Sequence, residues 1–474
     1  MEKHQHHRGS FGSSIGFLLS AIGSAVGLGN IWGFPYKMGA NGGFAFLIVY
    51  VLLALSVGFT LLIGEIAIGR KTGRSTIGAI RQMDKRTSIV GYMGVISGTM
   101  VVMFYCVLGG LCLRYCVGFF INIFGADGFG GTSEAFFQSF SQDTGSLILY
   151  TFLFAFLSGF ILMGGVQGGI EKFSSIAMPM LFLLIVALVI YVSRQPGAEA
   201  GYAFMFTPDW TYLKENFFTV LSTAAGQMFF SLSLAMGVMV TYGSYLKKDE
   251  NIPRDAAFIC GADTLIAVLA GCLVIPAAFA FVGEDAYMSG VKLLFVTMHQ
   301  VFTNIGGLLG NLLGFLFFLV VNIAAFTSSV SLLEVSISAI VDRRIDKKKE
   351  PKRKQVIAVC TLIVFLGAVP VALDALGGID GRTPRMLLQS ILPNLTAWSW
   401  NESFLNTYDL VSEGILMPLG ALLLSIFIGY RYGTKTVTDE CGMKPNRVLE
   451  ICYKFIVPVI MAVVLYGQIS SFLA

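Results

Sequence analysis

Charged residues are scarce in this chain. Only 13% of its 474 residues are Asp, Glu, Lys or Arg, while 55% are hydrophobic. A soluble globular domain carries about 25% charged residues. The composition therefore excludes such a domain and indicates a protein whose surface is solvated by lipid. The net charge is only +4, and no nucleic-acid partner is expected.

The sequence also lacks the motifs of the common catalytic classes. It contains no HExxH and no GxxxxGK[ST], so neither a metalloprotease nor an ATP-driven pump is expected. The protein is predicted not to be an enzyme. Its 8 cysteines include no CxxC pair and are interpreted as small packing residues. The first apolar run has no small-residue cleavage site, so no cleaved signal peptide is expected.

Long apolar runs are what the chain does contain. A helix needs about 20 apolar residues to cross a bilayer, and the sequence predicts eleven such spans in one transmembrane domain, residues 1–474. Their expected ranges are 13–37, 42–69, 89–124, 147–163, 173–192, 216–245, 256–282, 308–341, 356–376, 408–430 and 451–472. The fold class is therefore an all-α polytopic membrane protein.

Basic residues are divided unevenly between the loops. Most of the 32 Lys and Arg fall on the side that holds the N-terminus, including the run from Arg343 to Lys354. Basic loops tend to stay in the cytoplasm. The sequence thus predicts a cell-membrane protein with a cytoplasmic N-terminus and an extracytoplasmic C-terminus.

Two of the spans have unusual centres. Glycine and serine crowd residues 20–30 of the first span and polar residues interrupt 226–237 of the sixth. Each glycine costs a helix about 1 kcal/mol relative to alanine, and an opened backbone in lipid leaves polar groups unpaired. We therefore expect both helices to be broken around ions and a small polar solute. Interruptions five spans apart indicate an inverted five-plus-five repeat, about 11–194 and about 216–430, with an extra helix at about 447–473.

A few polar side chains lie inside other spans. The hydroxyl residues 327–329 of the eighth span could simply bond to the preceding helical turn, but beside two broken helices they are candidate oxygen ligands for Na⁺. Asp263 is a carboxylate within an apolar span and hence a functional candidate. Glu65 and Glu334 are interpreted as side chains that tie helices together.

Seven motifs extend this interpretation over the chain. They are SAVGLGNIWGFPY (24–36), NGGFAFLIVY (41–50), GGIEKFSSIAMP (168–179), GQMFFSLSLAMG (226–237), TYGSY (241–245), IPAAFAF (275–281) and FTSSVSLLE (326–334). Together they resemble the neurotransmitter:sodium symporter family, in its bacterial amino-acid transporter branch. The resemblance implies the LeuT-type fold of the bacterial leucine transporter, with helices 1 and 6 broken, and sodium-coupled symport by alternating access.

The resemblance also implies a substrate site and two sodium sites. The first sodium site would use the Ala25 carbonyl, Asn30, Ser231, Asp263 and the substrate carboxylate, and the second would use the carbonyls of Gly23, Val26 and Ala324 with the hydroxyls of Thr327 and Ser328. The substrate carboxylate would meet Leu28, Gly29 and Tyr105, and its ammonium group would meet carbonyls near Ala25, Phe230 and Ser231. The substrate side chain would lie among Val101, Phe230, Ser233, Met236, Ser329 and Leu332. Asp263 supplies a fixed negative charge, so no chloride requirement is expected.

Gly27 indicates the substrate class within this resemblance. Amine-transporting members place an Asp there to replace a missing substrate carboxylate, so glycine favours an amino acid. The mainly apolar pocket predicts neutral, hydrophobic or aromatic L-amino acids. Two alternatives stay open, namely an amino-acid sensor that does not transport, and a same-fold transporter of another small solute such as glycine or betaine. The oligomeric state stays open as well.

The expected outer gate departs from the family at one position. The family usually has NIWRFP, whose Arg pairs with an acid on the tenth span, whereas this chain has Gly33 and retains the matching acid as Asp409. Either Trp32 and Phe230 close the site by stacking, or another cation replaces the missing arginine. The inner gate is expected to be intact, with Arg8 facing Asp342 and Tyr245 nearby.

Overall fold

The computed structural model describes residues 9–283, 291–379, 382–389 and 397–472 of the chain. Within these ranges the secondary structure is helical and includes no strand. Nine of the helices found there are long and apolar enough to cross a membrane, and one bent pair makes a tenth candidate span. In the labels below, α marks an α-helix and η marks a π or 3-10 segment.

The first half of the chain contains the first five expected spans. They are α2 (Ser14–Ala25), η1 (Gly29–Gly33) and α3 (Phe34–Ala40); α4 (Phe44–Leu53), η2 (Ala54–Gly58) and α5 (Phe59–Thr72); α7 (Ser88–Ile123); α9 (Thr144–Met163); and η4 (Val166–Glu171) with α10 (Lys172–Val192). The connections contain α6 (Thr76–Met83), η3 (Lys85–Thr87) and α8 (Ser133–Gln142).

Two short helices, α11 (Ala198–Phe206) and α12 (Trp210–Glu215), connect the first half of the chain to the second. Its spans are α13 (Phe217–Ser231) with α14 (Val238–Gly243); α15 (Ile252–Phe281); α17 (Gly307–Asp346); α18 (Arg353–Leu373); α20 (Phe404–Asp409), η9 (Leu410–Leu416), α21 (Met417–Ile426) and η10 (Phe427–Tyr432); and α23 (Arg447–Ile451), η11 (Cys452–Ile456) and α24 (Val457–Phe472). The connections contain η6 (Leu293–Thr297), α16 (Met298–Ile305), η7 (Ala375–Gly377), α19 (Pro384–Gln389), η8 (Ser399–Asn401) and α22 (Thr434–Glu440).

The all-α polytopic fold is confirmed, but the count of eleven spans is not. The difference lies in the sixth expected span, where α13 has 15 residues and α14 has 6. Neither helix alone has the roughly 20 residues that a crossing needs. The boundaries of the two repeats stay a prediction.

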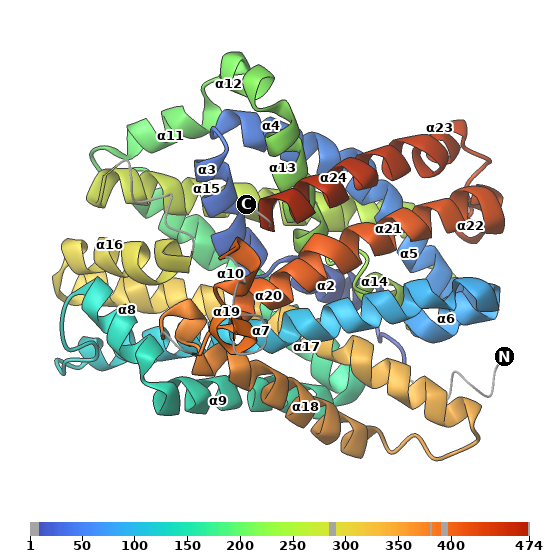
Figure 1. Ribbon diagram of the computed structural model, residues 1–474, viewed down its shortest axis with the longest axis horizontal. Helices are drawn as coiled ribbons and strands as arrows, with labels where there is room; N and C mark the ends of the chain where they lie inside the picture. Colours follow the sequence, from blue (N-terminus) through green and yellow to red (C-terminus); the bar gives the residue numbers. More distant parts are fainter. Residues whose placement is uncertain (1–8, 284–290, 380–381, 390–396, 473–474) are drawn as a thin grey trace.

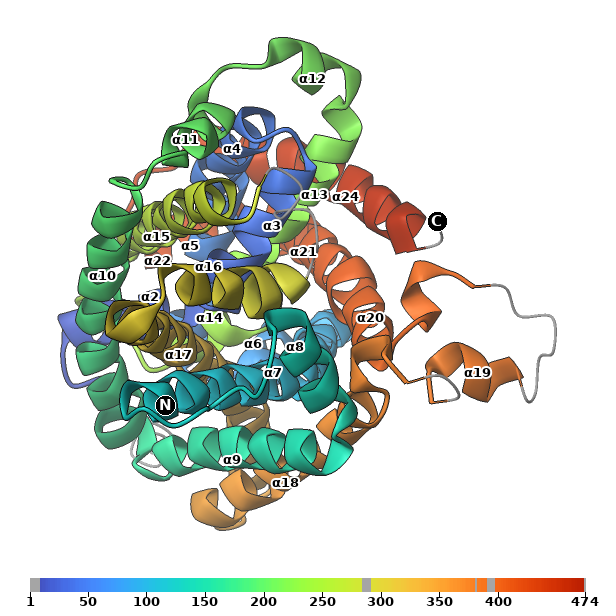
Figure 2. The ribbon, with the colours of Figure 1, turned by 90° about the vertical axis from the view of Figure 1, so that its left-hand side faces the viewer.

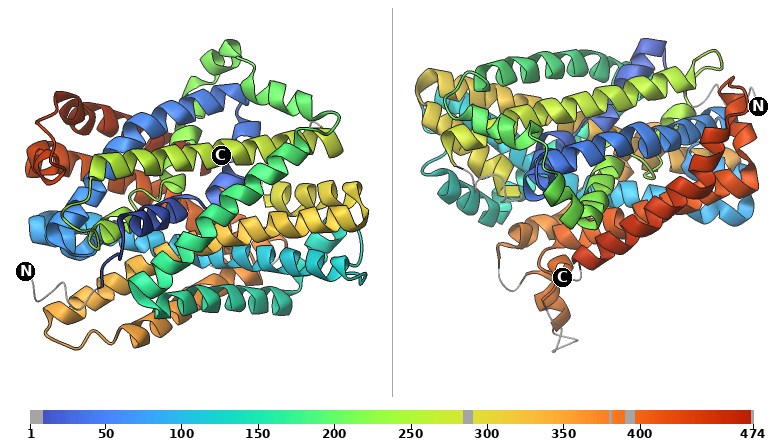
Figure 3. Two further views of the ribbon diagram at one scale, coloured as in Figure 1. Left: turned by 180° about the vertical axis from the view of Figure 1, so that it is seen from behind. Right: turned by 90° about the horizontal axis from the view of Figure 1, so that it is seen from above.

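The long helices lie side by side in one bundle (Figure 1). α2 packs against α10, α15 and α17, while α9, α10, α18 and α24 lie on the outside of the end-on view in Figure 2. Figure 3 shows the bundle from behind and from above, with α24 in red at its edge. Large apolar side chains such as Leu52, Phe156 and Leu183 are exposed, as expected for a surface that faces lipid tails.

Both expected interruptions are present. α2 ends at Ala25, and the axis bends by 47° before the helix resumes at Gly29. Between α13 and α14, Ser233 and Ala235 have φ angles of 52° and 58°, a left-handed conformation that costs a non-glycine residue about 1–2 kcal/mol. Glu65 of α5 holds this second break, because its Oε1 accepts the Ala235 N–H at 2.7 Å.

Candidate functional site

The two breaks enclose a small cavity near the middle of the bundle. Its wall comes from both breaks, α7 and α17, and consists of Ser24, Ala25, Gly27, Gly29, Val101, Tyr105, Phe230, Ser231, Ser233, Met236, Ser328 and Leu332. The cavity measures about 10 Å³, which holds about one water molecule. The wall is therefore closed in this conformation and must widen to accept an amino acid.

The wall contains most, but not all, of the expected substrate residues. Leu28 reaches the site through its main-chain N–H rather than its side chain, which is buried. Ser329 is buried but does not line the cavity, whereas its neighbour Ser328 does. Ser24 was not among the expected substrate residues, although it begins the first of the family motifs.

The expected carboxylate ligands lie together on one side of the cavity. The Leu28 N–H donates to the Tyr105 hydroxyl at 2.7 Å, and the Phe230 ring lies 6.5 Å from the Tyr105 ring. A Cβ atom on Gly27 would come within 2.5 Å of the Tyr105 hydroxyl and 2.4 Å of the Ser328 hydroxyl. Glycine at position 27 therefore keeps open the space in which these donors could hold a carboxylate.

The side chains expected at the first sodium site form one buried hydrogen-bond network. Asp263 accepts from the Asn30 amide at 2.8 Å and from the Ser231 hydroxyl at 2.8 Å. Tyr50 also donates to Asp263, at 3.0 Å. Tyr50 was missed in the sequence, because nothing there separates it from other buried aromatic residues of its motif.

The Asn30 amide is turned with its nitrogen toward Asp263. The Asn30 amide nitrogen points at Asp263 and Ser231, while its oxygen accepts the Gly27 N–H at 3.0 Å. Turning the amide by about 180° would present its oxygen instead. A sodium ion could then replace the Asn30 N–H groups as the positive partner of Asp263.

The residues expected at the second sodium site join α17 to the break after α2. Ser328 donates to the carbonyls of Ser24 and Val26, each at 3.2 Å. Thr327 instead bonds back along its own helix to the Ala324 carbonyl at 3.0 Å, as mid-span hydroxyls commonly do. A Cβ atom on Gly23 would lie 3.3 Å from the Thr327 Cβ, so this fifth expected ligand is also close.

Hydroxyl groups from α17 and from the α13–α14 connection satisfy carbonyls that the first break exposes. The Ser24 carbonyl accepts from Ser233 at 2.9 Å as well as from Ser328. The hydroxyls of Ser24 and Ser331 lie 2.7 Å apart. The breaks are thus stabilised by mutual hydrogen bonds that cross between α2, the α13–α14 connection and α17.

Comparison with known proteins identifies the family of this broken-helix site. The model of the sodium:neurotransmitter symporter family matches residues 8–124 and 135–380. The chain belongs to this family. It is similar to YhdH of Bacillus subtilis, an uncharacterised sodium-dependent transporter, with 33% identity over 97% of each chain. An uncharacterised sodium-dependent transporter of Haemophilus influenzae is 28% identical over 99% of the symporter and 100% of the relative.

A solved structure confirms the fold. The crystal structure of MhsT in complex with L-phenylalanine superposes on the symporter with a TM-score of 0.84 and 32% sequence identity, covering 97% of this chain and 100% of MhsT. The predicted family and LeuT-type fold are therefore confirmed. The protein is a multi-pass, sodium-dependent membrane transporter and not an enzyme.

Of the three residues expected at the inner gate of the symporter, Asp342 and Tyr245 lie among the described residues. Arg8 lies outside the described residues, so its expected contact with Asp342 stays a prediction. Asp342 itself is buried and accepts from the Ser75 N–H at 2.8 Å and the Ser75 hydroxyl at 2.7 Å. This contact joins the start of α6 to the end of α17.

Tyr245, also expected at the inner gate, lies in a second hydrogen-bond network of the symporter. Its hydroxyl donates to the buried Glu334 at 2.6 Å, and Arg353 donates to both Glu334 oxygens at 3.0 and 2.6 Å. The carboxylate therefore ties α17 to α18 and to the segment after α14, as interpreted from the sequence. Arg353 was missed because it belongs to a basic loop where most residues are solvated.

Position 33, where the family's arginine is missing, lies close to Gln227. A Cβ atom on Gly33 would lie 3.1 Å from the Gln227 side-chain oxygen, an atom with no hydrogen-bond partner among the described residues. Asp409 ends α20, and Trp32 is half-buried in η1. The expected stacking of Trp32 on Phe230 stays a prediction.

Proposed function

We propose that the symporter carries neutral, hydrophobic or aromatic L-amino acids, driven by a sodium gradient and moved by alternating access. The observation that carries this proposal is the composition of the central cavity wall. None of its described residues is charged, yet it holds an N–H and hydroxyl pair at Leu28 and Tyr105. A zwitterion suits such a wall because its two charges nearly balance each other.

Sodium would complete the site for the substrate carboxylate. In the first proposed sodium site, the ion would bind the Ala25 carbonyl, Asn30, Ser231 and Asp263 together with the carboxylate itself. The ion lowers the free-energy cost of burying the carboxylate, and the carboxylate lowers that of burying the ion. The second proposed site, between the first break and α17, would bind an ion with neutral oxygens alone.

Apolar residues in the wall support the proposed substrate class. Val101, Met236 and Leu332 line the cavity with the Phe230 ring. Methionine is flexible and fits irregular shapes, so rotation of Met236 and Phe230 could widen the cavity for a large side chain. The solved complex of the related MhsT contains L-phenylalanine, which agrees with an aromatic substrate.

Chloride independence and membrane orientation belong to the same proposal. Asp263 is a fixed anion beside the proposed first sodium site, so no chloride ion is needed to balance the charge. The loop between α17 and α18, which carries the basic run, lies at the same end of the bundle as α6 and α22 (Figure 1). This placement supports a cytoplasmic position for that end.

Uptake into proteoliposomes tests this function. A panel of labelled amino acids, glycine and betaine is offered with an inward sodium gradient, and with the gradient collapsed by a sodium ionophore. Gradient-dependent uptake of leucine, phenylalanine or tryptophan is expected, and replacement of chloride by gluconate should leave it unchanged. Sodium-dependent binding without uptake would instead indicate a sensor. Preference for glycine or betaine would refute the proposed substrate class.

A further inference from the structure

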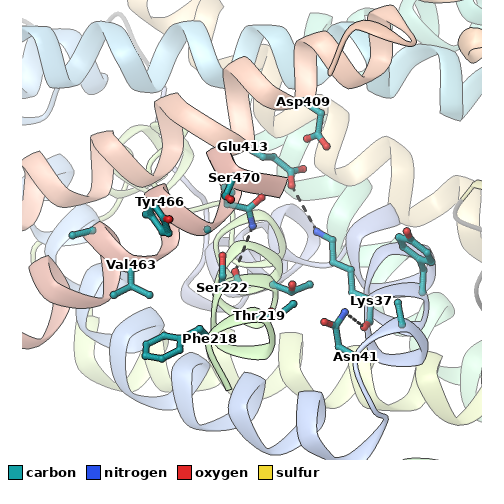
Figure 4. A pocket seen from close by; sticks show the side chains of 16 residues that line it. Lys37, Asn41, Phe218, Thr219, Ser222, Asp409, Glu413, Val463, Tyr466 and Ser470 are labelled. Atoms are coloured by element: carbon teal, nitrogen blue, oxygen red, sulfur yellow. Dashed lines mark hydrogen bonds and ion pairs between the residues drawn. The ribbon is translucent and has the colours of Figure 1, made fainter. Parts of the chain in front are cut away.

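A second, much larger cavity lies between α3, α13, η9 and α24, with a volume of about 1020 Å³ (Figure 4). Lys37 is the only basic residue among the described residues of its wall. Two acids, Asp409 and Glu413, lie opposite, one helical turn apart on the tenth span. The cavity therefore brings one cation and two carboxylates to the side of the bundle where α3 ends.

Lys37 and Glu413 join the two halves of this cavity. The Lys37 Nζ lies 3.7 Å from the Glu413 Oε2, and the two side chains are 24% and 13% exposed. In Figure 4 the lysine side chain extends from α3 toward the tenth span and meets the Glu413 carboxylate. The contact is thus a partly buried ion pair between the outer part of the first span and the tenth span.

The first span leads from the ion pair to the central site. Along the first span, Lys37 is followed inward by Gly33 and then by Gly29, each one helical turn deeper, so the pair lies about 12 Å from the central cavity. α13 leads inward in the same way. Its Thr223 lines the large cavity, and Gln227, one turn farther along, donates to the Gly29 carbonyl at 2.7 Å. The first span and α13 thus border both the large cavity and the central one.

We propose that Lys37 and Glu413 form the charged contact that closes the outer path to the substrate site. This inference rests on the proposed function, because it assigns a gate to the site described there. A gate at these two residues explains how the outer path can close although position 33 is glycine. The cation stands one turn farther along the first span, and its acid stands one turn after Asp409 along the tenth.

The same two spans carry both pairs of positions. Positions 33 and 37 lie one turn apart on the first span, and positions 409 and 413 lie one turn apart on the tenth, about 6 Å in each case. A contact between positions 37 and 413 therefore joins the same two spans as one between positions 33 and 409, and it can close the path between them.

A reporter cysteine at position 33 tests this gate without any substrate. Gly33→Cys places a thiol one turn inside the ion pair, and a membrane-impermeant maleimide measures how often the outer path opens. Lys37→Met and Glu413→Gln should each raise the labelling rate about fivefold, the factor expected for loss of a partly exposed ion pair. The double variant Lys37→Glu with Glu413→Lys should return the rate toward that of the parent.

The parent protein without the reporter measures labelling of the native cysteines. Lys292→Met is the matched control, because it removes an exposed ion pair with Glu134 (2.9 Å) and should not change labelling at position 33. Equal rates in all variants, or a charge-swapped variant that labels as fast as the single variants, would overturn the gate. Failure of the reconstituted protein to take up any amino acid would refute the proposed function alone, since labelling needs no transport.

Discussion

Replacement of Asp263 by asparagine is the most direct test of sodium coupling. The substitution keeps the size of the side chain and removes the buried carboxylate charge expected beside the first sodium ion. Two unit charges about 4 Å apart attract each other by about 4 kcal/mol at an effective dielectric constant of 20. The net loss is smaller, because the variant no longer carries the free-energy cost of burying the carboxylate.

The expected effect follows from that balance. Hydrogen bonds and contacts to charged groups contribute about 1.5–3 kcal/mol net, which corresponds to about a 10- to 100-fold change in a binding constant. We therefore expect Asp263→Asn to raise the sodium concentration for half-maximal substrate binding by about 10- to 100-fold. Binding of a labelled amino acid to the purified protein, titrated with NaCl at constant ionic strength, measures this concentration.

A second aspartate on α15 provides the control. Asp255 is also buried, but it lies in the first turn of the helix and pairs with Arg254 at 3.1 Å. Asp255→Asn should leave the sodium titration unchanged. If Asp263→Asn folds and shows the parental sodium dependence, Asp263 has no part in sodium binding and the proposed first site is wrong.

Three further substitutions test the carboxylate ligands and the outer path. Tyr105→Phe removes the hydroxyl bonded to the Leu28 N–H and should weaken substrate binding about 10- to 100-fold; unchanged affinity in the same assay would exclude that hydroxyl as a ligand. Gly27→Ala places a Cβ atom 2.5 Å from the Tyr105 hydroxyl and should abolish uptake without unfolding the protein, so normal uptake would contradict the carboxylate position. Gly33→Arg brings a guanidinium to the Gln227 oxygen, which has no partner in the described part of the chain, and should slow release of bound substrate in a chase experiment; an unaltered rate would show that position 33 has no part in gating.

The sequence predicts the breaks well because their cost is local. Glycine and serine destabilise a helix wherever they occur, and in lipid this cost is tolerated only where other groups bind the opened backbone. The conformation of the second break depends on distant residues, however. The left-handed Ala235 is held by Glu65 of α5, a contact between residues 170 positions apart that periodicity does not reveal.

Some residues of the site can likewise be found from the sequence, whereas others are revealed only by contacts between distant segments. Asp263 and the hydroxyls of α17 stand out because polar groups are rare in apolar spans. Tyr50 does not, since its contact with Asp263 joins positions 213 residues apart. The Lys37 and Glu413 pair was equally hidden, because each residue alone is an ordinary charge near the end of a span. Only the packing of the first span against the tenth makes them partners.

The hydroxyl groups around the first break bear on how the symporter completes its cycle. Ser233 and Ser328 both donate to the Ser24 carbonyl, and Ser328 also reaches the Val26 carbonyl. These bonds satisfy exposed carbonyls without help from a cation, while sodium at the proposed second site would use the Val26 carbonyl and the Ser328 hydroxyl for itself. With that ion bound, the break would exchange its internal hydroxyl partners for a cation. After releasing its cargo, a symporter must turn its empty site back to the first side of the membrane, and the internal hydroxyls give the broken helix a stable closed form for that step.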